Sequence, residues 1–253
     1  MKSKSSLRIA SLAAALAVAP ALAIASPITY SGSGGSLSAS VVFDTSGTNL
    51  IVTLTNTSSA DAMAPGDILT GVFFDINGVG TLGRVSAILA SGSVVNGNGG
   101  LTDAGGSVGG EWAYAAGITG PGLATEGISS SGLGLFGPGD VFGGTNLQGP
   151  ADPDGVQYGI TSAGDNPATG NGGISGQGLI QDSVVFTLSG LPSGFNPSAL
   201  GAISHVNFQY GTALTETDIP GQPRQLQAVP EPATLALLGT GLTVAAARLR
   251  RRK

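Results

Sequence analysis

Apolar and polar residues alternate with a period of two in two stretches near the start of the chain. Residues 36–43 and 50–55 each place every second residue, all of them apolar, on one face of an extended backbone. Turn-forming residues at 44–48 separate the two stretches, so the pattern predicts a β-hairpin. Similar alternation or short apolar runs predict further strands at 69–76, 85–89, 111–115, 156–160, 183–188 and 203–210.

The chain shows no helical period between residues 26 and 229. Many short strands with glycine and proline between them are typical of an all-β domain. We therefore expect 26–229 to form one antiparallel β-sandwich or jelly-roll-like domain, long enough to bury a substantial core.

The middle of this domain is rich in glycine. Residues 92–178 hold 27 of the 43 glycines in the chain. Because glycine loses the most conformational entropy on ordering, this segment is expected to be mostly loops, with short strands near Trp112 and Tyr158. It is either a set of ordered loops or a partly disordered segment, and its scattered large apolar residues favour ordered loops.

The N-terminal segment has the three parts of a secretory signal peptide. Basic residues within the first eight positions precede an Ala- and Leu-rich run at 12–24. Small residues follow, so residues 1–25 predict a signal peptide cleaved after Ala25, or after Ala23 in an alternative register. An uncleaved signal anchor is the alternative.

The C-terminal segment predicts a membrane helix. Residues 233–247 carry no charge, which corresponds to roughly 22 Å of helix. This is short for a span, but the helix can extend to about residue 249. The basic residues that follow predict that the C-terminus stays in the cytoplasm; they are Arg248, Arg250, Arg251, Arg252 and Lys253.

The tripeptide Pro230-Glu231-Pro232 stands immediately before this helix. Together with the apolar run and the basic end, it resembles the PEP-CTERM sorting signal of exported bacterial proteins. The resemblance implies a Gram-negative source and cleavage near the tripeptide by exosortase, a membrane-embedded, Cys-dependent transpeptidase-like enzyme. It also implies delivery to the cell surface or the exopolysaccharide matrix. A generic tail anchor is the alternative.

More loosely, the domain resembles other exosortase-dependent surface proteins with glycine-rich β domains. The stretches that carry this resemblance are 69–75, 110–114 and 131–140. It implies no particular activity.

The charges are divided between the domain and the ends. Eight of the ten basic residues lie in the two terminal segments, which leaves two arginines against fourteen acidic residues between 26 and 229, a net charge of about −12. This balance argues against nucleic acid as a partner. The absence of cysteine excludes disulfides, Cys-ligated metals and a Cys nucleophile, and the single histidine excludes a multi-His metal site.

Two glycine motifs lack the context that their chemistry needs. Residues 132–137 match G-x-G-x-x-G, but Pro138-Gly139 follows where a nucleotide-binding helix should begin. Residues 105–109 match G-x-S-x-G, and Ser107 with His205 is the corresponding hydrolase alternative. The pattern of 203–210 instead favours His205 as a solvent-facing histidine on that strand. A pair among Glu111, Glu126 and Glu216 is the glycosidase alternative, although their spacing selects no pair.

Aspartates on glycine-rich loops are the best candidates for calcium ligands. Carboxylate oxygens on such loops suit Ca²⁺, but aspartate is also an ordinary turn residue. The candidates are Asp140, Asp152, Asp154 and Asp165.

The sequence as a whole predicts a non-enzymatic, exported surface or matrix protein. Its expected partners are exosortase, the membrane as a transient anchor, and exopolysaccharide. The alternatives are a carbohydrate- or Ca²⁺-binding surface module and a secreted hydrolase.

Overall fold

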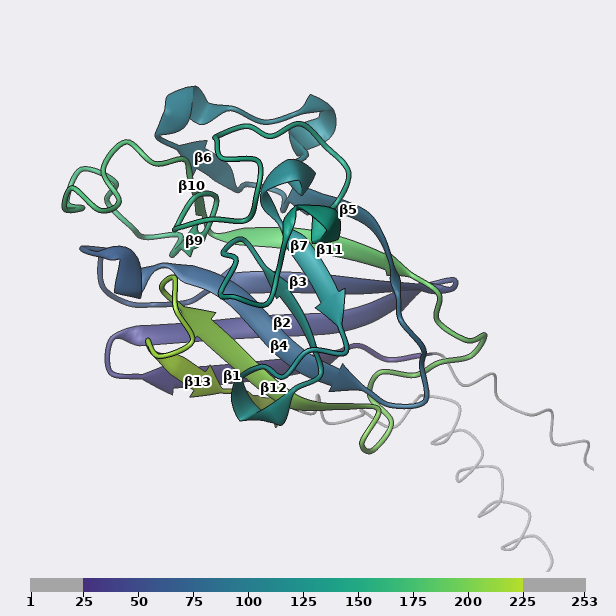
Figure 1. Cartoon of the computed structure of the whole chain (residues 1–253). Coiled ribbons are helices and arrows are strands. Elements are labelled where there is room, and N and C mark those ends of the chain that lie inside the picture. The colour runs from purple at the N-terminus through teal and green to yellow at the C-terminus, as the bar shows by residue number, and fades with distance from the viewer. Residues whose placement is uncertain (1–24, 225–253) are drawn as a thin grey trace, which may run out of the picture.

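The computed structural model describes residues 25–224, which form two β-sheets that face one another (Figure 1). The first sheet has the strand order β14 (Gln222–Arg224), β1 (Ile28–Gly34), β2 (Leu37–Ser46), β3 (Asn49–Asn56), β11 (Ser183–Ser189), β5 (Gly83–Leu89). All neighbours in this sheet are antiparallel. The predicted hairpin is β2–β3, with Ser46 opposite Asn49 at its tip.

The second sheet is built around β4. Its strand order is β13 (Asp218–Pro220), β12 (Ile203–Tyr210), β4 (Leu69–Ile76), β9 (Ile160–Thr161), β10 (Leu179–Gln181), β6 (Val94–Asn96). A branch adds β8 (Glu126–Ser129) beside β4 and β7 (Ala113–Ala116) beside β8. The pair β9–β10 is parallel, so the expected all-β class is confirmed but the second sheet is mixed rather than purely antiparallel.

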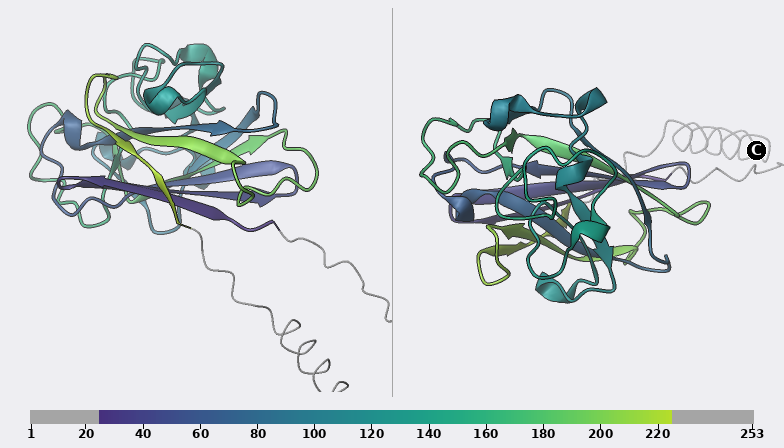
Figure 2. Two further views of the ribbon diagram at one scale, coloured as in Figure 1. Left: turned by 90° about the horizontal axis from the view of Figure 1, so that it is seen from below. Right: turned by 45° about the horizontal axis from the view of Figure 1, so that its top comes forward.

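The hydrophobic core lies between the sheets, as the two further views indicate (Figure 2). Phe43 of β2 meets Phe74 of β4 with ring centroids 5.1 Å apart, and Trp112 meets Phe186 of β11 at 4.9 Å. The alternating apolar residues of β2, β3 and β11 are the ones that point inward and are buried. Burying each such side chain contributes about 1.5–3 kcal/mol, so the alternation that predicted the strands also supplies the core.

Two predicted strands are shorter than expected. The stretch 111–115 begins with a 3₁₀ turn, η4 (Gly109–Glu111), and β7 starts only at Ala113. A Cβ on Gly110 would lie 2.0 Å from the carbonyl oxygen of Thr145, so the backbone here packs against another loop rather than extending as a strand. In 156–160 only Ile160 belongs to a strand, because the preceding residues turn and Tyr158 takes a φ of 54°.

The glycine-rich segment 92–178 carries β6 to β9 and several 3₁₀ turns. These turns are η2 (Asn98–Gly100), η3 (Ala104–Gly106), η4, η5 (Pro121–Leu123) and η6 (Pro138–Asp140); a further turn, η1 (Pro65–Asp67), lies before β4. Its large apolar side chains are buried in the core clusters, including Trp112, Tyr158 and Phe142. These aromatic residues fix the loops onto the sheets.

The two ends of the described chain lie side by side. Thr29 of β1 pairs with Arg224 of β14, and the two strands are antiparallel, so the chain enters and leaves at the same end of the domain (Figure 2). The backbone N–H of Ser26 donates to Asn196 Oδ1 at 3.2 Å, which places the 190–202 loop at this end too. Within residues 25–224 no helix is both long and apolar enough to cross a bilayer.

Candidate functional site

Most of the predicted sorting residues lie outside the described residues. This applies to Ala23, to the tripeptide 230–232, and to the basic end with Arg248, Arg250, Arg251, Arg252 and Lys253. Ala25 is the first described residue, and β1 begins three positions after it, at Ile28. The predicted signal-peptide junction therefore comes directly before the first strand.

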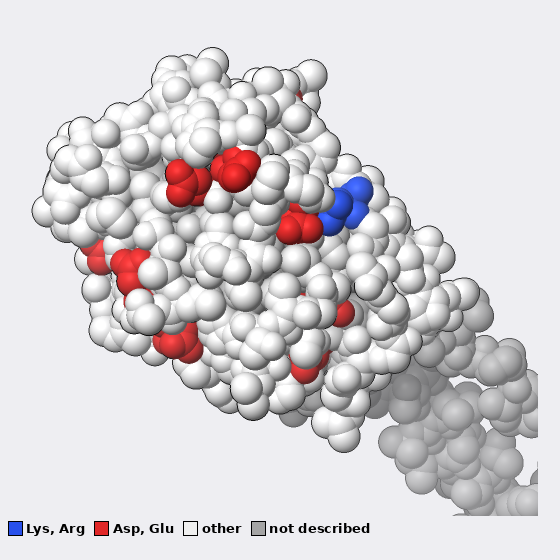
Figure 3. Space-filling view, in the orientation of Figure 1, with Lys and Arg blue, Asp and Glu red and all other residues white. Residues whose placement is uncertain are grey.

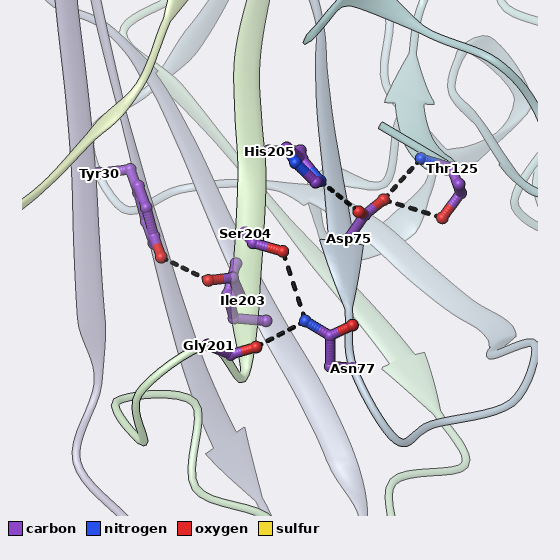
Figure 4. A network of polar contacts seen from close by, with 8 residues as sticks. All are labelled: Tyr30, Asp75, Asn77, Thr125, Gly201, Ile203, Ser204 and His205. Carbon is purple, nitrogen blue, oxygen red and sulfur yellow. Dashed lines mark hydrogen bonds and ion pairs between the residues drawn. The ribbon is translucent and has the colours of Figure 1, made fainter. Parts of the chain in front are cut away.

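A group of polar contacts joins β4 to β12. Nδ1 of His205 lies 2.5 Å from Oδ2 of Asp75 (Figure 4). The other oxygen of Asp75 accepts from the backbone N–H of Thr125 at 2.7 Å and from its hydroxyl at 2.8 Å. One carboxylate thus ties together two strands and the loop before β8.

A β-bulge aims His205 at Asp75. The β12–β4 register shifts between Ser204 and Asn207, and His205 takes a φ of 48°, in the left-handed region that non-glycine residues rarely occupy. The imidazole is 55% exposed, so the expected solvent-facing strand histidine is confirmed. Because Nδ1 faces the carboxylate, it donates to Asp75, and Nε2 is the ring atom available to solvent.

The charge state of Asp75 follows from these contacts. Partial burial acts to raise its pKa, but the hydrogen bonds from His205 and Thr125 outweigh burial and hold the pKa below its ordinary value. Asp75 is therefore an anion at neutral pH, and it orients the imidazole.

A second carboxyl, Glu126, lies on the core side of the same sheet. It is buried and accepts a hydrogen bond from the hydroxyl of Tyr114 at 2.7 Å. Burial raises the pKa of Glu126 to about 7; the hydrogen bond from Tyr114 opposes this rise and the charge of Asp75 adds to it. Burial also raises the pKa of Tyr114.

The other candidates for hydrolytic chemistry have local partners of their own. Glu111 is buried and accepts from the backbone N–H groups of Leu147 and Gln148, and burial raises its pKa. Glu216 accepts from the backbone N–H of Ala213 at 2.9 Å and so closes the turn after β12. Each carboxylate holds a loop in place.

Ser107 and His205 make contacts with different elements. Ser107 forms β-bridges with Ile88 of β5 and with Asp103, and its hydroxyl oxygen accepts from the backbone N–H of Gly109. The G-x-G-x-x-G stretch is followed by the 3₁₀ turn η6 rather than by an α-helix.

The four candidate calcium ligands are not gathered into one site. Asp140 accepts from the backbone N–H of Gly137 at 2.9 Å and lies 3.9 Å from Arg84, while Asp165 accepts from that of Ala62 at 2.7 Å. Asp152 and Asp154 are exposed. Across residues 25–224, no three His, Asp or Glu side chains are placed to hold a metal ion together.

A polar groove of about 490 Å³ lies beside β1 and β14. It is lined by the hydroxyl residues Ser31, Ser33, Ser38 and Thr57, by Gln222 and Arg224, and by Gly32, Ala39 and Pro220. Donors and acceptors on this groove suit a polar ligand.

Comparison with known proteins bears on the C-terminus. Residues 228–252 match the family model of the PEP-CTERM protein-sorting motif. The chain ends in a PEP-CTERM sorting motif. The motif implies an exported, transiently membrane-anchored protein that exosortase processes. No curated protein and no solved structure matches the chain.

The PEP-CTERM motif follows the folded domain closely. β14 ends at Arg224 and the motif begins at residue 228, so three residues separate them. The motif therefore leaves the domain from its edge strand, beside the start of β1.

Asp75 was not singled out by sequence reasoning as a partner of His205. The pairing depends on the β4–β12 register and on the bulge, neither of which alternation reveals. A local signal exists at Asp75 itself, because a charged residue there interrupts a strand that is otherwise buried from Leu69 to Ile76.

Proposed function

We propose that this chain is a non-enzymatic surface or matrix protein, held at the membrane by its C-terminal helix and then cut by exosortase. The observation that carries the proposal is the PEP-CTERM match at 228–252, directly after a folded β domain. In this proposal residues 1–25 direct export, about 233–249 span the membrane, and the basic end stays in the cytoplasm. The β domain then acts through its surface in the exopolysaccharide matrix.

The contacts of the titratable groups support a structural role for the domain. Asp75 and Glu111 both bind backbone N–H groups of loops, and Glu126 binds the hydroxyl of Tyr114. Such bonds order long loops, which is what a glycine-rich domain needs if it is to present a stable surface.

Replacing Pro230, Glu231 and Pro232 with alanine tests the sorting assignment. In a host that has the exosortase, we expect the variant to keep its C-terminal residues, because the tripeptide is the proposed recognition element. Mass spectrometry of the mature C-terminus and membrane fractionation measure this. A matched control replaces Gln225 and Gln227, just before the motif, and should be processed normally.

Replacing the basic end with neutral residues tests the topology. We expect impaired processing, because the positive cluster keeps the C-terminus in the cytoplasm and the helix in place. An unchanged mature C-terminus in both variants contradicts the assignment.

A second candidate function is binding of a polar saccharide in the groove beside β14. The hydroxyl groups and Arg224 that line it favour an acidic oligosaccharide. Isothermal titration with an acidic oligosaccharide tests this. We expect Arg224→Ala to weaken binding about tenfold, the loss of one charge-assisted hydrogen bond, while Met63→Ala leaves it unchanged. Equal affinities for the two variants would remove this candidate.

A further inference from the structure

The two ends of the domain differ in charge, and the difference follows the chain's points of entry and exit. We call the end where residues 25 and 224 lie the tether end. Three loops join strands there: 46–49, 77–82 and 190–202. The strand pairings bring these loops to the same end of the domain. Asn49 lies opposite Ser189, Ser189 opposite Gly83, and Ile76 opposite Ile203. No residue in these three loops is charged.

The opposite end of the domain is acidic. Leu69 and Tyr210 pair there, at the start of β4 and the end of β12. Six acidic residues lie in or beside the segments that join strands at this end: Asp61, Asp67, Asp165, Asp182, Glu216 and Asp218. Neither described arginine lies among these segments.

Both described arginines are placed toward the tether end. Arg84 is the second residue of β5 and Arg224 the last of β14. Acidic groups near this end have partners, since Asp140 lies 3.9 Å from Arg84 and Asp75 is bound to His205 and Thr125. In Figure 3 the visible basic group lies on the right with an acidic group beside it, and further acidic groups are spread over the left, middle and lower right of this face. Next to an anionic lipid surface this distribution turns the acidic end away and the tether end toward the membrane.

An exposed leucine stands on the tether end. Leu200 has a relative exposure of 101%, the highest among the large apolar side chains of the described domain. Asn77 Nδ2 donates to the carbonyl of Gly201 in this loop at 2.6 Å (Figure 4). The backbone N–H of Ser26 donates to Asn196 Oδ1, so the loop is held at two points. A leucine on an uncharged, well-held loop is suited to insertion at the boundary between lipid headgroups and acyl chains.

We propose that the tether end is a membrane-contacting surface, with Leu200 inserted into an anionic bilayer and the acidic end directed away from it. The proposal rests on the membrane anchor of the proposed function and adds the orientation of the domain. The residues 225–232 that precede the proposed helix reach at most about 28 Å when fully extended, so the tether end stays near the bilayer while the anchor is in place.

The absence of cysteine from the chain allows a clean experiment. The full chain carries a single Leu200→Cys substitution with an environment-sensitive fluorophore, and is reconstituted into vesicles that mix zwitterionic and anionic phospholipids. The matched control is Met63→Cys, which is also exposed but is next to the acidic residue Asp67. Vesicle flotation measures anchoring, and fluorescence with spin-labelled lipid measures contact.

For the probe at residue 200 we expect a blue-shifted emission that rises several-fold and is quenched by the spin-labelled lipid. The probe at residue 63 should remain in water, and the response at 200 should fall when zwitterionic lipid replaces the anionic lipid. If the protein floats with the vesicles but the two probes emit identically, the proposed membrane contact is wrong, while the membrane anchor of the proposed function is still supported. A response independent of lipid charge overturns the electrostatic orientation, and failure to float overturns the anchor itself.

Discussion

Glu126 gives the domain a pH dependence whose sign follows from its burial. Its pKa is raised from 4.5 to about 7 in the folded protein, whereas in the unfolded chain it returns to the ordinary value. Between these two values the folded state holds a proton that the unfolded state has lost. The free energy of unfolding therefore falls as pH rises through this window, and Glu126→Gln should remove that fall.

The magnitude follows from the two pKa values. A change from 4.5 to about 7 corresponds to at most about 3 kcal/mol between the protonated and the ionised protein. Glutamine keeps an oxygen that can accept the hydrogen bond from Tyr114 and carries no charge at any pH. We expect the variant to match the wild type below about pH 4.5 and to be more stable by up to about 3 kcal/mol above about pH 7.

Urea unfolding at a series of pH values measures this difference. Trp112 is the only tryptophan in the chain, is fully buried, and packs against Phe186, so its fluorescence reports loss of the core. The quantity of interest is the variant's free energy of unfolding minus that of the wild type, at each pH.

The pKa of Glu111 is also raised by burial, so Glu111 adds its own pH dependence to the free energy of unfolding. Its contribution is present in both the wild type and Glu126→Gln, and it cancels in their difference. A difference that stays constant from pH 4.5 to pH 7.5 would refute the reasoning, because it would mean that Glu126 ionises alike in the folded and unfolded chains.

Three further predictions concern packing and the Asp75 contacts. Phe186→Ala should lower the free energy of unfolding by about 3–5 kcal/mol in urea titrations, because it removes a ring packed between two other aromatic rings, whereas Thr187→Ala, on the opposite face of the strand, should lower it much less. In thermal melts, Gly110→Ala should lower the free energy of unfolding by about 1–3 kcal/mol, because its Cβ would lie 2.0 Å from a carbonyl oxygen. Gly143→Ala, which has open space around it, should leave the melting temperature nearly unchanged. Asp75→Asn should speed hydrogen exchange at the backbone amide of Thr125, which Asp75 binds. In the wild type the stabilisation from the Asp75 carboxylate is present above its ordinary pKa of 3.8 and is lost as the pH falls below that value. Equal exchange rates in the two proteins at pH 7 would count against this role.

Alternation predicted the long strands well, because each of them has one buried face. The strands β3 and β11 lie within one residue of their predicted bounds, and β2 begins one residue and ends three residues later than predicted. β1 was not predicted, since its serines and glycines obscure the two inward residues Ile28 and Tyr30. The parallel pair β9–β10 was not predicted either, because pairing between short distant segments depends on tertiary contacts.

The candidate site was predictable only in part. The exposure of His205 was predicted correctly, but its partner Asp75 required the cross-strand register. The raised pKa of Glu126 depends on its burial on the core side of β8, beside Tyr114 of β7, which the glycine-rich sequence around these strands does not reveal. The sorting motif, in contrast, is a local pattern and needed no tertiary information.

The position of β14 has a mechanical consequence. This strand pairs with β1 at three positions only, and it is the last described element before the anchor. While the anchor is embedded, any force between the cell surface and the matrix enters the domain through these pairs. A force along the strand acts on the three β1–β14 pairs at once, in shear, whereas a force across the strand separates the pairs one after another. The short edge strand β14 is therefore expected to detach under force before the core between the sheets is disrupted.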